Sequence, residues 1–172
     1  QATPHVERVL NPMSVLPDVL QTGLNIVFCG TAPGTVSAMQ QAYYAGPGNK
    51  FWPTLFEVGL TPHRFTPAEY PALLPLGIGL TDLVKHTFGA DSVLSSSDFG
   101  REELQAKILH YQPRILAFTS KRAGQEFLGG PLQYGLQERK VGDTLLFVLP
   151  SPSGLARRFW TVEPWRELAM LL

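Results

Sequence analysis

The stretch "FCGTAPG", residues 28–34, decides the expected fold of this chain. It follows the apolar run "LNIV", residues 24–27, so a buried strand leads directly into a loop of glycine, proline and small residues. In an open α/β sheet, the loop at the carboxyl end of such a strand faces a ligand. Ala32 lies in this loop, and its methyl group has no atom that can take part in proton transfer.

Composition predicts one domain over residues 1–172, with residues 1–23 as an N-terminal arm or short helix. Hydrophobic residues make up 44% of the chain, which is enough for a packed core. The single cysteine excludes a disulfide framework and a four-thiolate metal or iron-sulfur centre within the chain. The apolar runs are too short to span a bilayer and no basic leader opens the chain, so we expect a cytoplasmic protein without membrane contact.

The formal net charge is zero, with 14 basic and 14 acidic side chains. A chain with this balance is not a general electrostatic binder of nucleic acid, because such binding requires an excess of positive charge. We therefore expect any contacts with phosphate groups to be local.

Strand-like and helix-like segments alternate along the chain. The predicted strands are Asn25–Cys29, roughly Leu76–Thr81, Arg114–Thr119 and Leu145–Leu149, and the clearest predicted helices are Glu102–Tyr111, Lys121–Leu128 and Glu163–Leu172. This alternation favours an α/β fold in which a mostly parallel sheet is covered by helices on both faces.

Polar or glycine-rich residues follow each predicted strand. They are Gly30–Gly34, Thr81–Asp82, Thr119–Lys121 and Pro150–Gly154. Because the carboxyl ends of parallel strands meet at one edge of the sheet, we expect these four segments to form a single site. None contains a Walker loop or the Gly-x-Gly-x-x-Gly pattern, which argues against a nucleotide cofactor.

Five motifs together resemble the mismatch-specific uracil/thymine DNA glycosylase family of the uracil-DNA glycosylase superfamily. They are "FCGTAPG" (28–34), "YYAGPGNKFW" (43–52), "GIGLTDLV" (77–84), "YQPRILAF" (111–118) and "LPSPSGLARR" (149–158). The resemblance implies a three-layer α/β/α sandwich with a short, mostly parallel four- or five-stranded sheet. It also implies no metal, no cofactor, and removal of uracil or a related base from double-stranded DNA. We expect the protein to act as a monomer.

An enzyme of this kind must rotate a base out of the duplex and hold it in a pocket. The resemblance places Tyr44 where an aromatic ring stacks on the base, although a core or loop aromatic is the alternative. Asn49 is expected to cap the helix that follows and to order the pocket wall, while Phe51 and Trp52 pack in the core. The remaining predicted pocket residues are Gly30, Thr31, Ala32 and Ser151, the last at a position where many relatives have Asn.

The loop after the fourth predicted strand is interpreted as a wedge that fills the space left by the base. The resemblance assigns intercalation to Gly154, Leu155, Ala156 and Arg157. Ser151, Ser153 and Arg158 are expected to face phosphate groups. A plain surface turn is the alternative. Lys121 and Arg122, at the start of a predicted helix, are further candidates for phosphate contact, or are ordinary solvated charges.

Water activation is where the chain departs from the family pattern. The family has Asn at the position of Ala32 and uses it to hold the attacking water, so that role cannot be transferred. Cleavage of an N-glycosidic bond passes through a cationic sugar that a carboxylate can stabilise. We predict Asp91 as the catalytic carboxylate, ahead of Asp82, which alternatively caps a following helix. Asp91 could instead be a solvated loop residue, and His86 is a weaker candidate beside Lys85.

Two other classes of function stay open at this point. One is a protein that binds mismatched or abasic DNA without cutting it, which Ala32 allows. The other is an unrelated α/β enzyme that acts on a small molecule at the same sheet edge.

Overall fold

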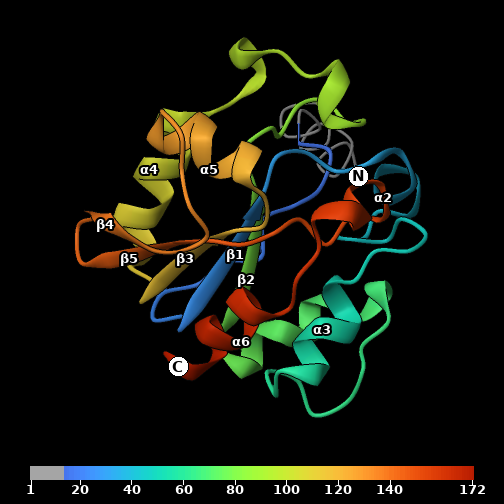
Figure 1. The fold of residues 1–172 in the computed structure, drawn as a ribbon, viewed down its shortest axis with the longest axis horizontal. Coiled ribbons are helices and arrows are strands. Elements are labelled where there is room, and N and C mark those ends of the chain that lie inside the picture. The colour runs from blue at the N-terminus through green and yellow to red at the C-terminus, as the bar shows by residue number, and fades with distance from the viewer. Residues whose placement is uncertain (1–13) are drawn as a thin grey trace, which may run out of the picture.

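The computed structural model describes residues 14–172, and these form a five-stranded sheet in the order β2-β1-β3-β5-β4 (Figure 1). The strands are β1 (Ile26–Gly30), β2 (Ile78–Asp82), β3 (Ile115–Phe118), β4 (Gly135–Val141) and β5 (Thr144–Val148). β1 runs parallel to β2 and β3, and β5 runs parallel to β3, whereas β4 pairs antiparallel with β5. The mostly parallel sheet is therefore confirmed.

Helices cover both faces of the sheet. The α-helices are α2 (Thr35–Gln40), α3 (Phe51–Glu57), α4 (Arg101–Tyr111), α5 (Lys121–Leu128) and α6 (Glu163–Met170), and the 3-10 helices are η1 (Pro67–Leu76), η2 (Asp91–Val93), η3 (Ser96–Asp98) and η4 (Gly154–Phe159). Figure 1 shows α4 and α5 on one face and α3 and α6 on the other. This arrangement confirms the three-layer sandwich. No helix in the described range 14–172 is long and apolar enough to cross a membrane.

Two hydrophobic cores form because successive side chains of a strand point to opposite faces. On one face Phe28 of β1 packs against Phe51 and Trp165, with ring centroids 5.2 and 5.7 Å away. On the other face Val27 joins a separate buried cluster that includes Ile108 of α4. β1 is buried along its whole length, which explains why it reads as an uninterrupted apolar run.

The order of the strands places a crevice at the carboxyl end of β1. The chain moves from β1 to β2 on one side, and β3 then pairs with the other side of β1. Ligands bind in open α/β sheets at such a reversal of strand order. Backbone hydrogen bonds continue beyond the sheet here, because the N–H groups of Leu83, Val84 and Gly89 donate to the carbonyls of Gly30, Thr31 and Pro33 at 2.9, 2.7 and 2.9 Å.

The structure differs from the sequence-based expectation in three places. β4 was not predicted, because its interior is polar or charged apart from the exposed Leu136 and only its two ends are buried. β2 begins at Ile78 instead of Leu76, since η1 extends to Leu76 and ends at Gly77, whose φ of 80° favours glycine. The predicted arm or helix over residues 1–23 lies partly outside the described residues. Within its described part, Val19 forms an antiparallel bridge with Leu80.

Candidate active site

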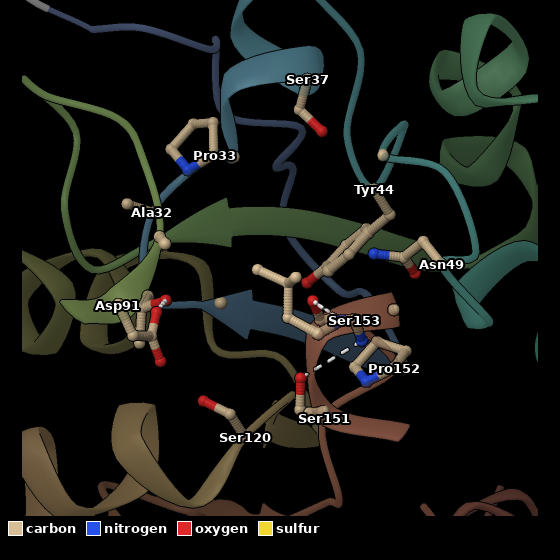
Figure 2. Close-up of a pocket in the computed structure, with 18 of the residues that line it drawn as sticks. Ala32, Pro33, Ser37, Tyr44, Asn49, Asp91, Ser120, Ser151, Pro152 and Ser153 are labelled. Carbon is tan, nitrogen blue, oxygen red and sulfur yellow. Dashed lines mark hydrogen bonds between the residues drawn. The ribbon is translucent and has the colours of Figure 1, made fainter. Parts of the chain in front are cut away.

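The loops that follow four of the strands surround one pocket of about 860 Å³. Its lining includes Gly30–Gly34 after β1, Asp82 at the end of β2, Thr119 and Ser120 after β3, and residues 151–157 after β5. The expected convergence of polar strand ends is therefore confirmed. The turn that contains Tyr44 and Asn49 and the loop that contains Asp91 complete the wall (Figure 2).

Tyr44 presents an aromatic ring to this pocket. One face of the ring stacks on Phe51 of α3, with centroids 3.9 Å apart and planes inclined by 18°. The Tyr44 hydroxyl lies 3.1 Å from the Thr119 hydroxyl, which fixes the tip of the ring. Tyr44 has a φ of 54°, a left-handed conformation that costs free energy for a residue with a side chain and is retained at functional sites. Figure 2 shows the ring directed toward the centre of the pocket.

Asn49 precedes the N-cap residue of α3, Lys50, so it is not the cap that the sequence predicts, but its side chain still bonds to the start of the helix. Its side-chain oxygen accepts a hydrogen bond from the backbone N–H of Phe51 at 2.9 Å. Phe51 and Trp52 are both buried in the core. Asn49 also lines the pocket, so the residue that bonds to the first turn of α3 is part of the wall.

Asp91 lies across the pocket from Tyr44, on the same side as Ala32 (Figure 2). The hydroxyl of Thr31 donates a hydrogen bond of 2.7 Å to the Asp91 carboxylate. Ala32 follows Thr31 in the chain and lines the same pocket. The first-strand loop therefore supplies the hydroxyl that orients an acidic side chain from a segment 60 residues away.

Arg122 holds the loop that contains Asp91, a role that the sequence analysis missed. Its guanidinium donates to the backbone carbonyls of Asp91 and Leu94 at 2.7 and 3.2 Å, and it lies 5.1 Å from the centre of the Phe99 ring. Charge-assisted bonds of this kind are stronger than neutral ones. The arginine that was considered for phosphate contact is thus engaged with the protein itself. The sequence shows that Arg122 could donate to two carbonyl groups, but it does not show which carbonyl groups lie within reach.

Asp82 is buried and contributes to the pocket lining, and the prediction that it caps a helix is wrong. No helix begins after β2, since the chain enters an irregular segment that reaches η2 only at Asp91. The Oδ2 atom of Asp82 is buried without a hydrogen-bond partner. Burial raises the pKa of this carboxyl to about 7, with Asp18 adding to the increase and Lys85 and Lys107 opposing it.

The loop after β5, residues 150–158, is tied to the turn that contains Tyr44. The backbone N–H of Lys50 donates to the carbonyl of Pro152 at 2.8 Å. A Cβ atom on Gly154 would lie 2.7 Å from the carbonyl oxygen of Pro47, so only glycine allows this approach. The hydroxyls of Ser151 and Ser153 accept bonds from the N–H groups two residues later, at 3.2 and 3.1 Å.

The loop after β5 also presents Leu155 to solvent, with 85% of its surface exposed. Leu155, Ala156 and Arg157 line the pocket, whereas Arg158 and Lys121 do not. The Lys121 ammonium lies 4.6 Å from the centre of the Tyr134 ring, and the Arg158 guanidinium lies 5.5 Å from that of Phe159. His86 is outside this lining and, together with Asp82, lines a second pocket of about 160 Å³.

Within residues 14–172, no group of three or more His, Cys, Asp or Glu side chains is arranged to hold a metal ion. The side chains that line the described pocket supply carboxyl, hydroxyl, amide and guanidinium groups and an aromatic face.

The comparisons with known proteins identify the superfamily of the chain. The family model "Uracil DNA glycosylase superfamily" matches residues 17–169, so the chain belongs to this superfamily of enzymes that remove uracil or damaged bases from DNA. The fold is similar to the solution NMR structure of a protein from Methanosarcina acetivorans that is provisionally named a uracil DNA glycosylase. The TM-score is 0.61 and the identity 23%, over 90% of this chain and 92% of that one. This likeness supports the fold.

The buried carboxyl of Asp82 predicts how stability depends on pH. Its pKa is higher in the folded protein than in the unfolded chain, so the folded protein binds more protons and loses stability as pH rises from about 4 to about 7. Asp82→Asn removes this loss. We expect the variant to gain up to about 4 kcal/mol relative to the parent between pH 4 and pH 8, measured by urea unfolding at both pH values.

Asp143→Asn is the matched control, because Asp143 is exposed in the turn between β4 and β5. This variant should change the free energy of unfolding by the same amount at pH 4 and at pH 8. If Asp82→Asn also shifts stability by the same amount at pH 4 and pH 8, the Asp82 carboxyl does not titrate in this range.

Proposed function

We propose that this protein is a monofunctional, mismatch-specific uracil-DNA glycosylase that acts as a monomer. It rotates uracil or a related mismatched or damaged base out of double-stranded DNA, hydrolyses the N-glycosidic bond and leaves an abasic site for base excision repair. It needs no cofactor, and it works on DNA in the cytoplasm. Membership of the superfamily supports the general reaction, and the five motifs support the mismatch-specific family.

The hydrogen bond between Thr31 and Asp91 is the observation on which the mechanism rests. It holds a carboxylate beside Ala32, the position where the family has its water-binding Asn. In the proposed mechanism, Asp91 accepts a hydrogen bond from the attacking water, removes its proton and stabilises the positive charge on the sugar. We prefer Asp91 to Asp82 as the general base because Asp82 lies deeper and its pKa of about 7 leaves it partly protonated at neutral pH.

The other parts of the pocket have complementary roles in this proposal. Tyr44 stacks on the base with the face that is not covered by Phe51. Leu155 and Arg157 enter the space that the base leaves in the duplex. Ser153, Arg158 and Lys121 contact phosphate groups of the DNA. The negative charge on the departing base is stabilised by backbone N–H groups of the first and fourth loops.

A uracil-containing duplex tests the proposal directly. After incubation and alkali treatment, strand breaks on a gel indicate a glycosylase. A shifted band without breaks indicates the non-catalytic sensor of mismatched or abasic DNA. If the gel shows neither strand breaks nor a shifted band, the unrelated small-molecule enzyme is favoured.

The general base predicts the behaviour of Asp91→Asn. This change keeps the size and most hydrogen bonding of the side chain but removes the charge that draws the proton. We expect single-turnover cleavage to slow on the order of 10²-fold or more, with binding to abasic product nearly unchanged. Ala32→Asn in the same background should restore part of the rate, because it supplies an amide that can hold water.

Asp98→Asn is the comparison variant, since Asp98 is an exposed residue of η3 on the same loop. It should cleave at close to the parental rate. If Asp91→Asn cleaves as fast as the parent, Asp91 is not the general base.

The stacking role predicts different effects for two Tyr44 variants. Tyr44→Ala removes the ring and should cost about 1 to 3 kcal/mol of base binding. Tyr44→Phe keeps the ring and should retain most activity. Activity is measured per folded molecule, alongside the melting temperature. A large drop in melting temperature for Tyr44→Ala, with activity per folded molecule unchanged, would make Tyr44 a core residue only.

The wedge predicts a difference between two forms of substrate. Replacing Leu155 and Arg157 with Gly should weaken cleavage of uracil in a duplex much more than cleavage in a single strand, which has no vacated stack to fill. The measurement is the ratio of kcat/KM for the two substrates. Equal losses on both would show that the loop is not a wedge.

A further inference from the structure

The segment that carries Asp91, residues 90–98, is attached to the rest of the protein at few points. Leu94 is its one buried residue, and the others are exposed. Within the described part of the chain, three hydrogen bonds join the segment to other elements. The Thr31 hydroxyl forms one, to the Asp91 carboxylate, and the Arg122 guanidinium forms the other two. The position of Asp91 therefore depends strongly on two side chains.

The guanidinium of Arg122 uses all three of its nitrogen atoms. Nη1 donates to the carbonyl of Asp91 at 2.7 Å, and Nη2 donates to the carbonyl of Leu94 at 3.2 Å. Nε lies 3.5 Å from the carboxylate of Glu126. A guanidinium presents its donors in a rigid planar fork, whereas a lysine ammonium is a compact charge on a flexible stem. Arginine can therefore hold both carbonyls and the carboxylate at once, and lysine cannot.

Glu126 and α5 fix the guanidinium in turn. Glu126 lies one turn after Arg122 on α5, and its carboxylate also pairs with Arg101 of α4 at 3.4 Å. The side chain of Glu126 is only 18% exposed, so solvent screens these ion pairs less than it would at an open surface. Ser120 caps α5 by accepting a hydrogen bond of 3.0 Å from the N–H of Ala123, and Ser120 lines the main pocket. Arg122 thus connects the segment 90–98 to a helix that begins at the pocket.

The two carbonyls that Arg122 holds lie at the two ends of η2. Asp91 is the first residue of this short helix, and Leu94 is the residue that follows its last turn. The bond from Thr31 reaches one side-chain oxygen of Asp91 and leaves the backbone free to turn about it. The two bonds from Arg122 fix the backbone on both sides, so the carboxylate has a defined position and direction.

We propose that Arg122 is a positioning residue for the hydrolysis, which holds the Asp91 carboxylate where it can take a proton from the attacking water. This inference rests on the proposed glycosylase function and on Asp91 as its general base. It assigns Arg122 to the rate of the chemical step, in place of the phosphate contact that the sequence suggested. Arg122 acts through Asp91 and does not touch the substrate.

The demands of general-base catalysis explain why this support matters. A general base must lie within hydrogen-bond distance of the proton that it removes. A displacement of about 1 Å at a reacting group can slow an enzyme on the order of 10²-fold. DNA binding has no such dependence on Asp91, because the proposed phosphate and wedge contacts come from other segments.

The experiment measures single-turnover cleavage of a uracil-containing duplex as a function of enzyme concentration. It yields the maximal rate and the half-saturating concentration separately. Arg122→Lys keeps the positive charge but cannot hold both carbonyls. We expect its maximal rate to fall at least about tenfold, while its half-saturating concentration stays within about threefold of the parent. Arg122→Gln should show the same division, whereas loss of a phosphate contact would raise the half-saturating concentration.

A double variant tests whether Arg122 acts through Asp91. Once Asp91→Asn has removed the general base, the position of that side chain should matter little to the rate. Arg122→Lys should therefore slow the Asp91→Asn enzyme by less than about twofold, although it slows the parent at least about tenfold. A general role in folding the site would slow both enzymes by the same factor.

Two further variants exclude simpler explanations. Arg139→Lys is the matched control, because Arg139 also donates to a backbone carbonyl, that of Leu128, at 3.0 Å and at the other end of α5. It should cleave at close to the parental rate. Glu126→Gln weakens the hold on the guanidinium without changing the segment 90–98. It should lower the maximal rate at least about twofold when Asp91 is present, and should have no effect in the Asp91→Asn enzyme.

The outcomes separate the inference from the proposed function. If the parent does not cleave uracil, the glycosylase function fails and the inference fails with it. If the parent cleaves and Asp91→Asn cleaves equally fast, the inference fails although the glycosylase function stands. Arg122→Lys overturns the inference if it is folded and has the parental maximal rate, or if it slows Asp91→Asn as much as the parent. If the melting temperature shows that Arg122→Lys is unfolded, the same comparison with Glu126→Gln decides.

Discussion

The pairing of the first-strand loop with the segment after β2 determines how the pocket is built. Three backbone hydrogen bonds from residues 83–89 to the carbonyls of Gly30, Thr31 and Pro33 extend the contact between these chains beyond the sheet. They fix Asp82 beside Gly30, and they direct the following chain over the pocket, where Asp91 meets the hydroxyl of Thr31. Backbone bonds impose this arrangement without regard to side chains. The loop can therefore have Ala32 in place of a polar residue and keep its shape.

The two acidic side chains of the described pocket lie in contrasting environments. Asp91 is exposed, bonded to a hydroxyl and held through its backbone by Arg122. Asp82 is buried, with an unpaired oxygen and a pKa raised to about 7. When two carboxyl groups of one site differ in this way, one is available as a base while the other can remain protonated. The environment of each residue, and not its chemical type, therefore favours Asp91 over Asp82 as the proposed general base.

The sequence predicted those parts of the structure whose signal lies in local patterning. The four parallel strands were found because apolar runs end at glycine, proline or polar residues, and their loops were expected at one edge for geometrical reasons. β4 was missed because an edge strand with charged interior residues has no apolar run, and such charges are a common way to protect an exposed edge. The positions of Arg122 and Asp82 depend on contacts between distant segments, which spacing along the chain cannot show.

The burial of Asp82 affects the stability of the free protein. Its carboxyl lies at the end of β2 with almost no contact with water, and this burial raises its pKa to about 7. The folded state therefore binds a proton more tightly than the unfolded chain does, and it loses stability as pH rises toward neutral. The rest of the fold must offset this cost, and the buried apolar side chains of β1 and β2 on either side of the carboxyl are the main source of that stability.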